Sequence, residues 1–224
     1  MKDVLLIADL HGQFGKIDSF LELSPEAVFI AGDITNMGPV DTVDDVLSRI
    51  EVPCFAVPGN CDPREIIETI EHSDTVCLHG NSINLGKMTI VGIGGSNPTP
   101  FGTPFEMTDK QMGDLLSGAL KKMEKTVHNV LLTHAPPYDT LDLINGEHVG
   151  SASLRKHIKE FDLVCCAHIH EQRGVKDVDG VKIVNPGAAM DGYCAMLHFG
   201  NEAKDIKVEL LSVKRGAIQD TRRG

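Results

Sequence analysis

Five strand-like apolar runs of this chain are each followed by polar side chains that can bind metal. The runs span residues 4–8, 27–31, 54–57, 130–133 and 163–167. The polar residues that follow them are Asp9, His11, Asp33, Asn60, His134, His168 and His170. Carboxylate, amide and imidazole groups suit divalent cations such as Mn²⁺, Fe²⁺ and Zn²⁺, and this set contains no thiolate. The pattern therefore predicts metal chemistry at the ends of strands.

The size of the set predicts two ions. Seven groups are too many ligands for one divalent ion. Two ions about 3.5 to 4 Å apart that share one carboxylate would use all seven, and Asp33 is the predicted bridge. Taken alone, Asp33 after Gly32 is more typical of a turn aspartate that caps the next helix. The same pattern at four other strand ends favours the metal site.

The order of the elements explains how these side chains would meet. Strand and helix patterns alternate in the first part of the chain, where residues 14–21 and 43–50 carry apolar side chains at helical spacing. This alternation predicts an α/β architecture, in which active sites lie at the carboxyl ends of strands. Side chains two apart on an extended segment point the same way, so Asp9 can meet His11, and His168 can meet His170.

The second part of the chain has more varied elements. Short strands separated by turns between residues 75 and 95 predict antiparallel edges, so that the sheets are mixed. Asp62 and Pro63 are typical of the cap and first position of a helix, and Thr108 with Gln111 forms a capping box. Residues 96–107 lack periodicity and predict a loop, which could be a lid, a dimer contact or a plain surface loop.

Composition narrows the class of protein. The chain has 224 residues, of which 42% are hydrophobic and 24% charged, which fits one domain over residues 1–224 with a frayed tail at 215–224. A net charge of −11 argues against non-specific binding to nucleic acid or to an anionic membrane. Six cysteines without a CxxC pair fit a reducing cytoplasm, and no apolar run approaches the ~20 residues that span a bilayer.

Five motifs together resemble a known family. Asp9-Leu10-His11, Gly32-Asp33, Gly59-Asn60, His134 and His168-Ile169-His170 have the order and spacing of the calcineurin-like metallophosphoesterases. The chain is most similar to their small Icc-related prokaryotic members, from about Asp3 to Ala188. This resemblance implies a four-layer αββα sandwich, with two mixed sheets packed face to face and helices outside.

The resemblance also implies a ligand set and a reaction. One metal would be held by Asp9, His11, Asp33 and His170, and the second by Asp33, Asn60, His134 and His168. Mn²⁺ or Fe is expected, with Zn²⁺ and Ni²⁺ as alternatives. A hydroxide that bridges the two ions would attack a small phosphate ester, with Asp33, Asn60 and His134 as catalytic residues.

Three positions depart from the family pattern and bear on the substrate. Many relatives carry a histidine after Gly-Asn that is proposed to protonate the leaving oxygen, where this chain has Cys61. Cys61 either takes part in catalysis or only fills a tight loop. Protein phosphatases of the superfamily carry an aspartate and an arginine where Asn36 and Met37 stand here, which argues against a phosphoprotein substrate.

The expected activity is hydrolysis of a phosphodiester, because a good leaving group needs less help from an acid. The alternatives are a phosphomonoesterase of small metabolites and a non-catalytic scaffold on the same fold. His148 is a further candidate for substrate contact, although a loop histidine of this kind is more typical of a solvated or capping residue. A homodimer is compatible with the sequence.

Overall fold

Two β-sheets pack face to face, because their central strands are apolar on both sides. The computed structural model describes residues 1–214 and 217–220. In these residues the first sheet consists, in order, of β15 (Ala217–Asp220), β14 (Ile206–Lys214), β13 (Tyr193–Phe199), β1 (Asp3–Ile7), β2 (Ala27–Ala31), β3 (Cys54–Val57) and β4 (Thr75–Cys77). The second consists of β11 (Gly174–Val178), β12 (Val181–Asn185), β10 (Leu163–Cys165), β7 (His128–Thr133), β6 (Met88–Ile93) and β5 (Asn81–Asn84).

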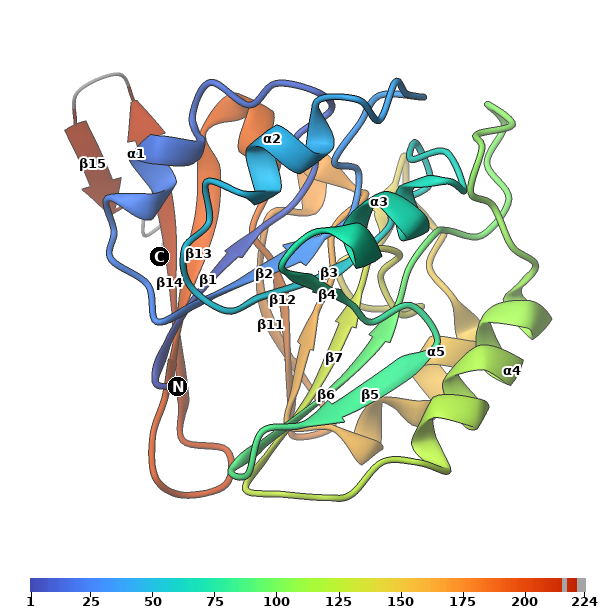
Figure 1. Ribbon diagram of the computed structural model, residues 1–224. Helices are drawn as coiled ribbons and strands as arrows, with labels where there is room; N and C mark the ends of the chain where they lie inside the picture. Colours follow the sequence, from blue (N-terminus) through green and yellow to red (C-terminus); the bar gives the residue numbers. More distant parts are fainter. Residues whose placement is uncertain (215–216, 221–224) are drawn as a thin grey trace.

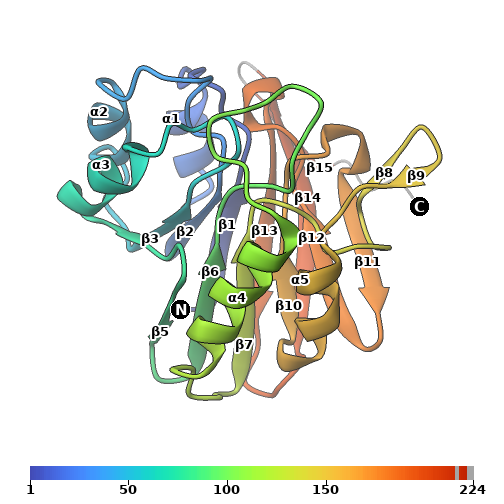
Figure 2. The same ribbon diagram turned by 90° about the vertical axis from the view of Figure 1, so that its right-hand side faces the viewer.

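Helices cover the outer face of each sheet (Figure 1, Figure 2). The described helices are α1 (Ile17–Leu21), α2 (Val43–Leu47), α3 (Ile66–His72), α4 (Asp109–Leu120) and α5 (Ala152–His157), with short 3₁₀ turns at η1 (Ile158–Glu160), η2 (His170–Gln172) and η3 (Ala189–Asp191). Helices α1, α2 and α3 pack on the first sheet, and α4 and α5 pack on the second.

Three apolar layers hold these elements together. Side chains such as Leu6 of the first sheet and Leu132 of the second form the layer between the sheets. Val46 belongs to the layer under α1, α2 and α3, and Leu116 to the layer under α4 and α5. The predicted αββα sandwich with two mixed sheets is therefore confirmed.

Parallel strands bring the predicted site residues to one edge of the sandwich. Strands β1, β2 and β3 are parallel neighbours, with Ile7 opposite Ile30 and Ala31 opposite Val57. In the second sheet β7 is parallel to β10, with Leu132 opposite Cys165. The carboxyl ends of these five strands are followed by the seven candidate ligands.

Some local predictions were right and others wrong. Thr108 caps α4 in the predicted capping box with Gln111. Asp62 does not cap α3, which begins at Ile66 after Glu65. The side chain of Asp62 is instead buried and accepts hydrogen bonds from the turn after β2. A small hairpin of β8 (Leu143–Ile144) and β9 (Glu147–His148) was not predicted, because two-residue strands leave no periodic pattern.

The C-terminal prediction also needs correction. Residues 217–220 form β15, which pairs with β14, although we expected fraying over 215–224. Residues 215–216 and 221–224 lie outside the described part of the chain. Within that part, none of the helices has the length and apolar character needed to cross a bilayer.

His79 links stability to pH. Its Nδ1 accepts a hydrogen bond of 3.0 Å from the backbone N–H of Gly94, and its ring packs edge-on against Phe105. Burial, helped by the charge of Arg64, lowers the pKa of His79 to about 4. Because the pKa is lower in the folded state, the stability that depends on neutral His79 is complete above about pH 6.5. It is lost as the pH falls towards 4.

We expect His79→Asn to reduce this pH dependence, because asparagine can accept the same hydrogen bond and does not titrate. Between pH 7 and pH 4 the wild type should lose about 3 kcal/mol more stability than the variant. Urea unfolding at several pH values measures the difference. If the free energy of unfolding changed with pH by the same amount in the two proteins, the prediction would be wrong.

Candidate metal centre

The turns after β1 and β2 hold each other through the backbone. Asp9 N–H donates to the carbonyl of Gly32 at 3.0 Å, and His11 N–H donates to the carbonyl of Asp33 at 2.9 Å. A third bond of 2.9 Å joins Gly12 N–H to the carbonyl of Ile34. Three successive bonds therefore fix Asp9 and His11 relative to Asp33.

Four candidate ligands have a left-handed backbone. Their φ angles are 55° at Asp9, 46° at His11, 50° at Asp33 and 71° at His168. This region is unfavourable for residues with a Cβ atom, by roughly 1–2 kcal/mol each. Such strain is typical of functional sites, where the surrounding structure enforces the conformation. The four residues are thus held in place by their neighbours and not by local preference.

The loop after β3 closes against Asp33. Cys61 N–H donates to Asp33 Oδ1 at 2.8 Å. Gly59 lies so close that a Cβ atom there would collide with the backbone nitrogen and the carboxylate of Asp33. Only glycine permits this approach, which explains the Gly-Asn sequence of the motif.

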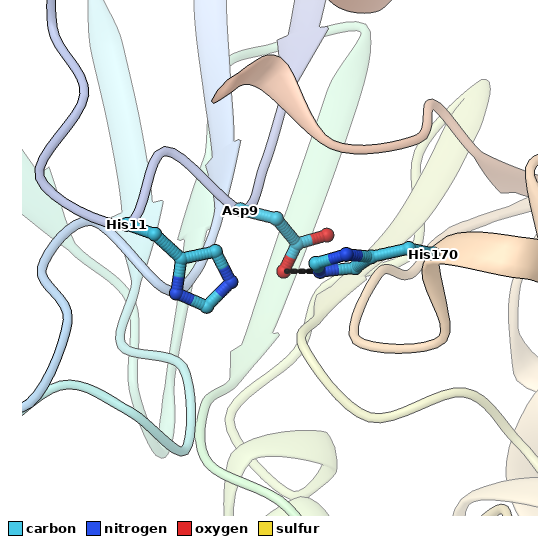
Figure 3. Close-up of side chains that lie close together, drawn as sticks. All are labelled: Asp9, His11 and His170. Atoms are coloured by element: carbon cyan, nitrogen blue, oxygen red, sulfur yellow. Dashed lines mark ion pairs between the residues drawn. The ribbon is translucent and has the colours of Figure 1, made fainter. Parts of the chain in front are cut away.

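The first group of candidate ligands surrounds the carboxylate of Asp9. Figure 3 shows this carboxylate between the rings of His11 and His170. His170 Nε2 lies 3.7 Å from Asp9 Oδ1, and His11 Nε2 lies 3.6 Å from Asp33 Oδ2. One ligand atom each from Asp9, His11 and His170 fits within 4.8 Å of the others. This spacing suits a shared cation.

The second group crosses between the sheets. His134 Nε2 lies 2.8 Å from Asn60 Oδ1 and 3.5 Å from Asp33 Oδ1. Its other nitrogen, Nδ1, donates to the carbonyl of Ala31 at 2.8 Å, which orients the ring and leaves Nε2 towards the site. The ring of His168 lies 5.1 Å from that of His134. Asp33 therefore faces the first group with Oδ2 and the second with Oδ1.

The state of Asp9 shows that this arrangement fits a cation. Asp9 is fully buried, and both of its carboxylate oxygens lack a hydrogen-bond partner among the described residues. Burial alone would raise the pKa of Asp9, but the imidazoles around it, with His170 first, outweigh burial and lower the pKa below its usual value. A buried anion without hydrogen bonds is costly, and a bound divalent ion would remove that cost.

The two histidines after β10 differ in their surroundings. Burial lowers the pKa of His168 to about 3, so the ring is neutral and offers a lone pair. Its neighbour His170 sits beside Asp9, and that contact raises the pKa of His170. A cation at the centre would replace the proton that Asp9 favours on His170.

A second layer of polar residues supports the candidate ligands. Asp62 is buried and accepts hydrogen bonds from the backbone N–H groups of Ile34, Thr35 and Gly59, at 3.2, 2.7 and 2.8 Å. It thus ties the turn after β2 to the loop after β3. The sequence analysis missed this role, because an aspartate before a proline is also typical of a helix cap.

Asn60 is oriented from the loop of residues 96–107. Its Nδ2 donates to Thr103 Oγ1 at 3.0 Å, which turns Oδ1 towards His134. Thr103 Oγ1 in turn donates to Glu106 at 2.7 Å, and Thr99 donates to the same carboxylate at 2.6 Å. No sequence signal connected Thr103 with Asn60, since they are far apart in the chain.

The structure brings the seven predicted ligands together, and Cys61 lies beside them. The Sγ atom of Cys61 fits within 4.8 Å of ligand atoms of His11 and Asp33. Burial, and then the negative charge of Asp33, raises the pKa of the Cys61 thiol.

His148 lies apart from this cluster. Its Nδ1 is 2.7 Å from buried Asp142, its Nε2 is 3.4 Å from Asp139, and its ring packs on Tyr138. Its predicted contact with substrate stays a prediction.

Comparison with known proteins identifies the family of this chain. Residues 2–172 match the model of the calcineurin-like phosphoesterase family. An uncharacterized protein of Methanocaldococcus jannaschii is 34% identical over 192 residues, which cover 80% of this chain and 85% of that protein.

Two solved structures show the same fold. The structure of TT1561 from Thermus thermophilus has a TM-score of 0.71 at 19% identity, covering 92% of this chain and 97% of that one. A dimetal phosphatase from Danio rerio has a TM-score of 0.56 at 9% identity, covering 94% of each chain. The family model matches residues 2–172 of the 224 in this chain, and the candidate ligand motifs gather at one edge of the sandwich. The chain therefore belongs to the calcineurin-like phosphoesterase family.

Proposed function

We propose that this protein is a phosphoesterase with two divalent metal ions and a preference for phosphodiesters. The observation that carries the proposal is the position of Asp33, whose two oxygens face different histidines at 3.6 and 3.5 Å. A carboxylate in this position can serve two ions at once. Asp9, His11 and His170 would complete one ion's ligands.

Asn60, His134 and His168 would complete the set of the other ion. Two bound cations would lower the pKa of a water molecule towards neutrality and stabilise the negative charge of the phosphoryl group. The chain positions the ligands through the Asp62 hydrogen bonds and the Asn60–Thr103 contact. Oxygen and imidazole ligands favour Mn²⁺ or Fe, with Zn²⁺ and Ni²⁺ as alternatives.

The preference for diesters rests on Cys61. A thiol is a weaker acid than the protonated imidazole that many relatives carry at this position, so it is the poorer proton donor to a departing oxygen. Esters whose alcohol leaves without protonation should therefore react best. A phosphomonoesterase is the nearer alternative, and a scaffold without catalysis is the more distant one.

We expect Asp33→Asn and His134→Ala to lower kcat/KM for bis(p-nitrophenyl) phosphate by about 10³-fold or more, because each removes a ligand from the centre. Asp177→Asn and His72→Asn are matched controls, since both side chains are exposed and lie outside the cluster. Chelator-treated protein with Mn²⁺ added back provides the assay, with p-nitrophenyl phosphate as the competing monoester. Near wild-type rates in either site variant would rule the proposal out.

Metal binding should also stabilise the fold. We expect a saturating excess of Mn²⁺ to raise the Tm of chelator-treated protein by about 5–10 °C, because the ion compensates the buried carboxylates. Differential scanning calorimetry measures the shift. The shift should shrink in Asp33→Asn and persist in Asp177→Asn. Equal Tm values with and without Mn²⁺ would contradict a centre of this kind.

Thr103 allows a test of the supporting layer. We expect Thr103→Val to weaken Mn²⁺ binding by about 10-fold or more, because Asn60 loses the partner that orients it. Thr99→Val is the matched control: Thr99 donates to the same Glu106 carboxylate, and none of its described hydrogen bonds involves Asn60. Calorimetric titration of both variants gives the affinities. Similar affinities for the two would show that Asn60 needs no such support.

A further inference from the structure

A cavity of about 530 Å³ opens beside the candidate metal centre. Asn60 and His168 line it, so the cavity is continuous with the proposed second metal position. The start of the 96–107 loop forms one wall, and the β8–β9 hairpin with Val149 forms another. Figure 2 shows this loop and the hairpin at the same end of the sandwich. The volume is within the range of pockets that enclose small organic ligands, about 300–1,000 Å³.

The lining of this cavity is mainly apolar. Three of its residues are large apolar side chains left open to solvent: Phe101 is 81% exposed, Val149 40% and Ile144 39%. They come from two segments, the 96–107 loop and the β8–β9 hairpin with Val149, and meet at one cavity. Exposed apolar groups gathered at one place are typical of a binding site, because a ligand that covers them removes them from water.

The charges around the cavity select against anions. Among the described residues that line it, the one charged side chain is the exposed carboxylate of Glu171, and no lysine or arginine is present. A second phosphate or a carboxylate placed beside Glu171, away from the metal centre, would be repelled, and no lysine or arginine of the lining would offset the repulsion.

Hydrogen bonds within the loop hold this wall in place. Glu106 accepts hydrogen bonds from the backbone and the hydroxyl of Thr103 and from the hydroxyl of Thr99. Phe105 is buried in the apolar layer under α4. These contacts anchor the loop on both sides of Phe101.

We propose that this cavity binds the organic group of the phosphate ester, and that this group is uncharged, largely apolar and at least as large as a naphthyl ring. The proposal rests on the proposed function and adds the substrate class. Phosphate esters of apolar alcohols or aryl groups fit the cavity. Sugar bisphosphates, nucleoside polyphosphates and acidic phosphopeptides do not.

The test uses phosphonates, because their C–P bonds are not hydrolysed and binding is measured without turnover. Calorimetric titration of Mn²⁺-loaded protein compares 1-naphthylmethylphosphonate with methylphosphonate. We expect the naphthyl compound to bind about 30-fold more tightly or better, since it buries the apolar ring. Equal affinities would overturn the proposal.

Variants of cavity residues test whether the naphthyl ring binds there and whether the cavity disfavours a negative charge. Phe101→Ala combined with Val149→Ala should reduce the naphthyl preference at least about fivefold. Val76→Ala, on an equally exposed valine of β4 outside the cavity, should leave it unchanged. Benzylphosphonate should bind more tightly than 4-carboxybenzylphosphonate, and Glu171→Gln should narrow that difference. An unchanged naphthyl preference in the double variant, or no penalty for the carboxylate, would contradict the assignment.

Hydrolysis separates this inference from the proposed function. If no diester is hydrolysed with any of the four metals while the naphthyl preference persists, the proposed reaction is wrong and the apolar site is retained. If bis(p-nitrophenyl) phosphate is hydrolysed but the naphthyl preference is absent, the reaction stands and the substrate class is wrong.

Discussion

The burial of charge is the constraint on which the rest of this structure depends. Asp9 and Asp33 place two carboxylates at the junction of two sheets, where water cannot solvate them. The backbone N–H of Cys61 and the imidazoles compensate part of that charge, whereas the buried Asp62 adds a further carboxylate nearby. Both oxygens of Asp9 remain without hydrogen bonds in the described residues, so the protein's own groups leave the site electrostatically incomplete. A bound cation would resolve this imbalance, and the fold holds the candidate ligands in place for it.

The apolar layers make such a centre compatible with a stable fold. A centre with left-handed backbone at four positions opposes folding, and the strain persists because the layers around both sheets contribute far more. At the cavity, too, different side chains stabilise the fold and face the solvent. Phe105 anchors its loop in the core, and Phe101, four residues earlier, stays in solvent where a ligand could cover it. Stability and recognition are thus assigned to different side chains of one loop.

Local patterns in the sequence predicted an α/β architecture with mixed sheets and the seven clustered residues, and the resemblance to a known family added the face-to-face sandwich. Apolar runs mark buried strands, and the polar residue after each run marks its carboxyl end. Features that depend on contacts between distant segments could not be predicted. Asp62 has the local pattern of a helix cap, and only the neighbouring turn shows that it supports Gly59 and Thr35. The Asn60–Thr103 contact and the cavity walls at Phe101 and Val149 arise in the same way.

The bond from His134 to the carbonyl of Ala31 joins the two sheets and has a consequence for the order of assembly. Asp9 to Asn60 come from the first sheet, and His134 to His170 come from the second. A chain made from its N-terminus therefore carries its carboxylates long before it carries most of its imidazoles. Until His170 has emerged and β7 has docked beside β2, the early segment offers mainly hard oxygen ligands. The complete set of oxygen and imidazole groups exists only once the second sheet has packed on the first.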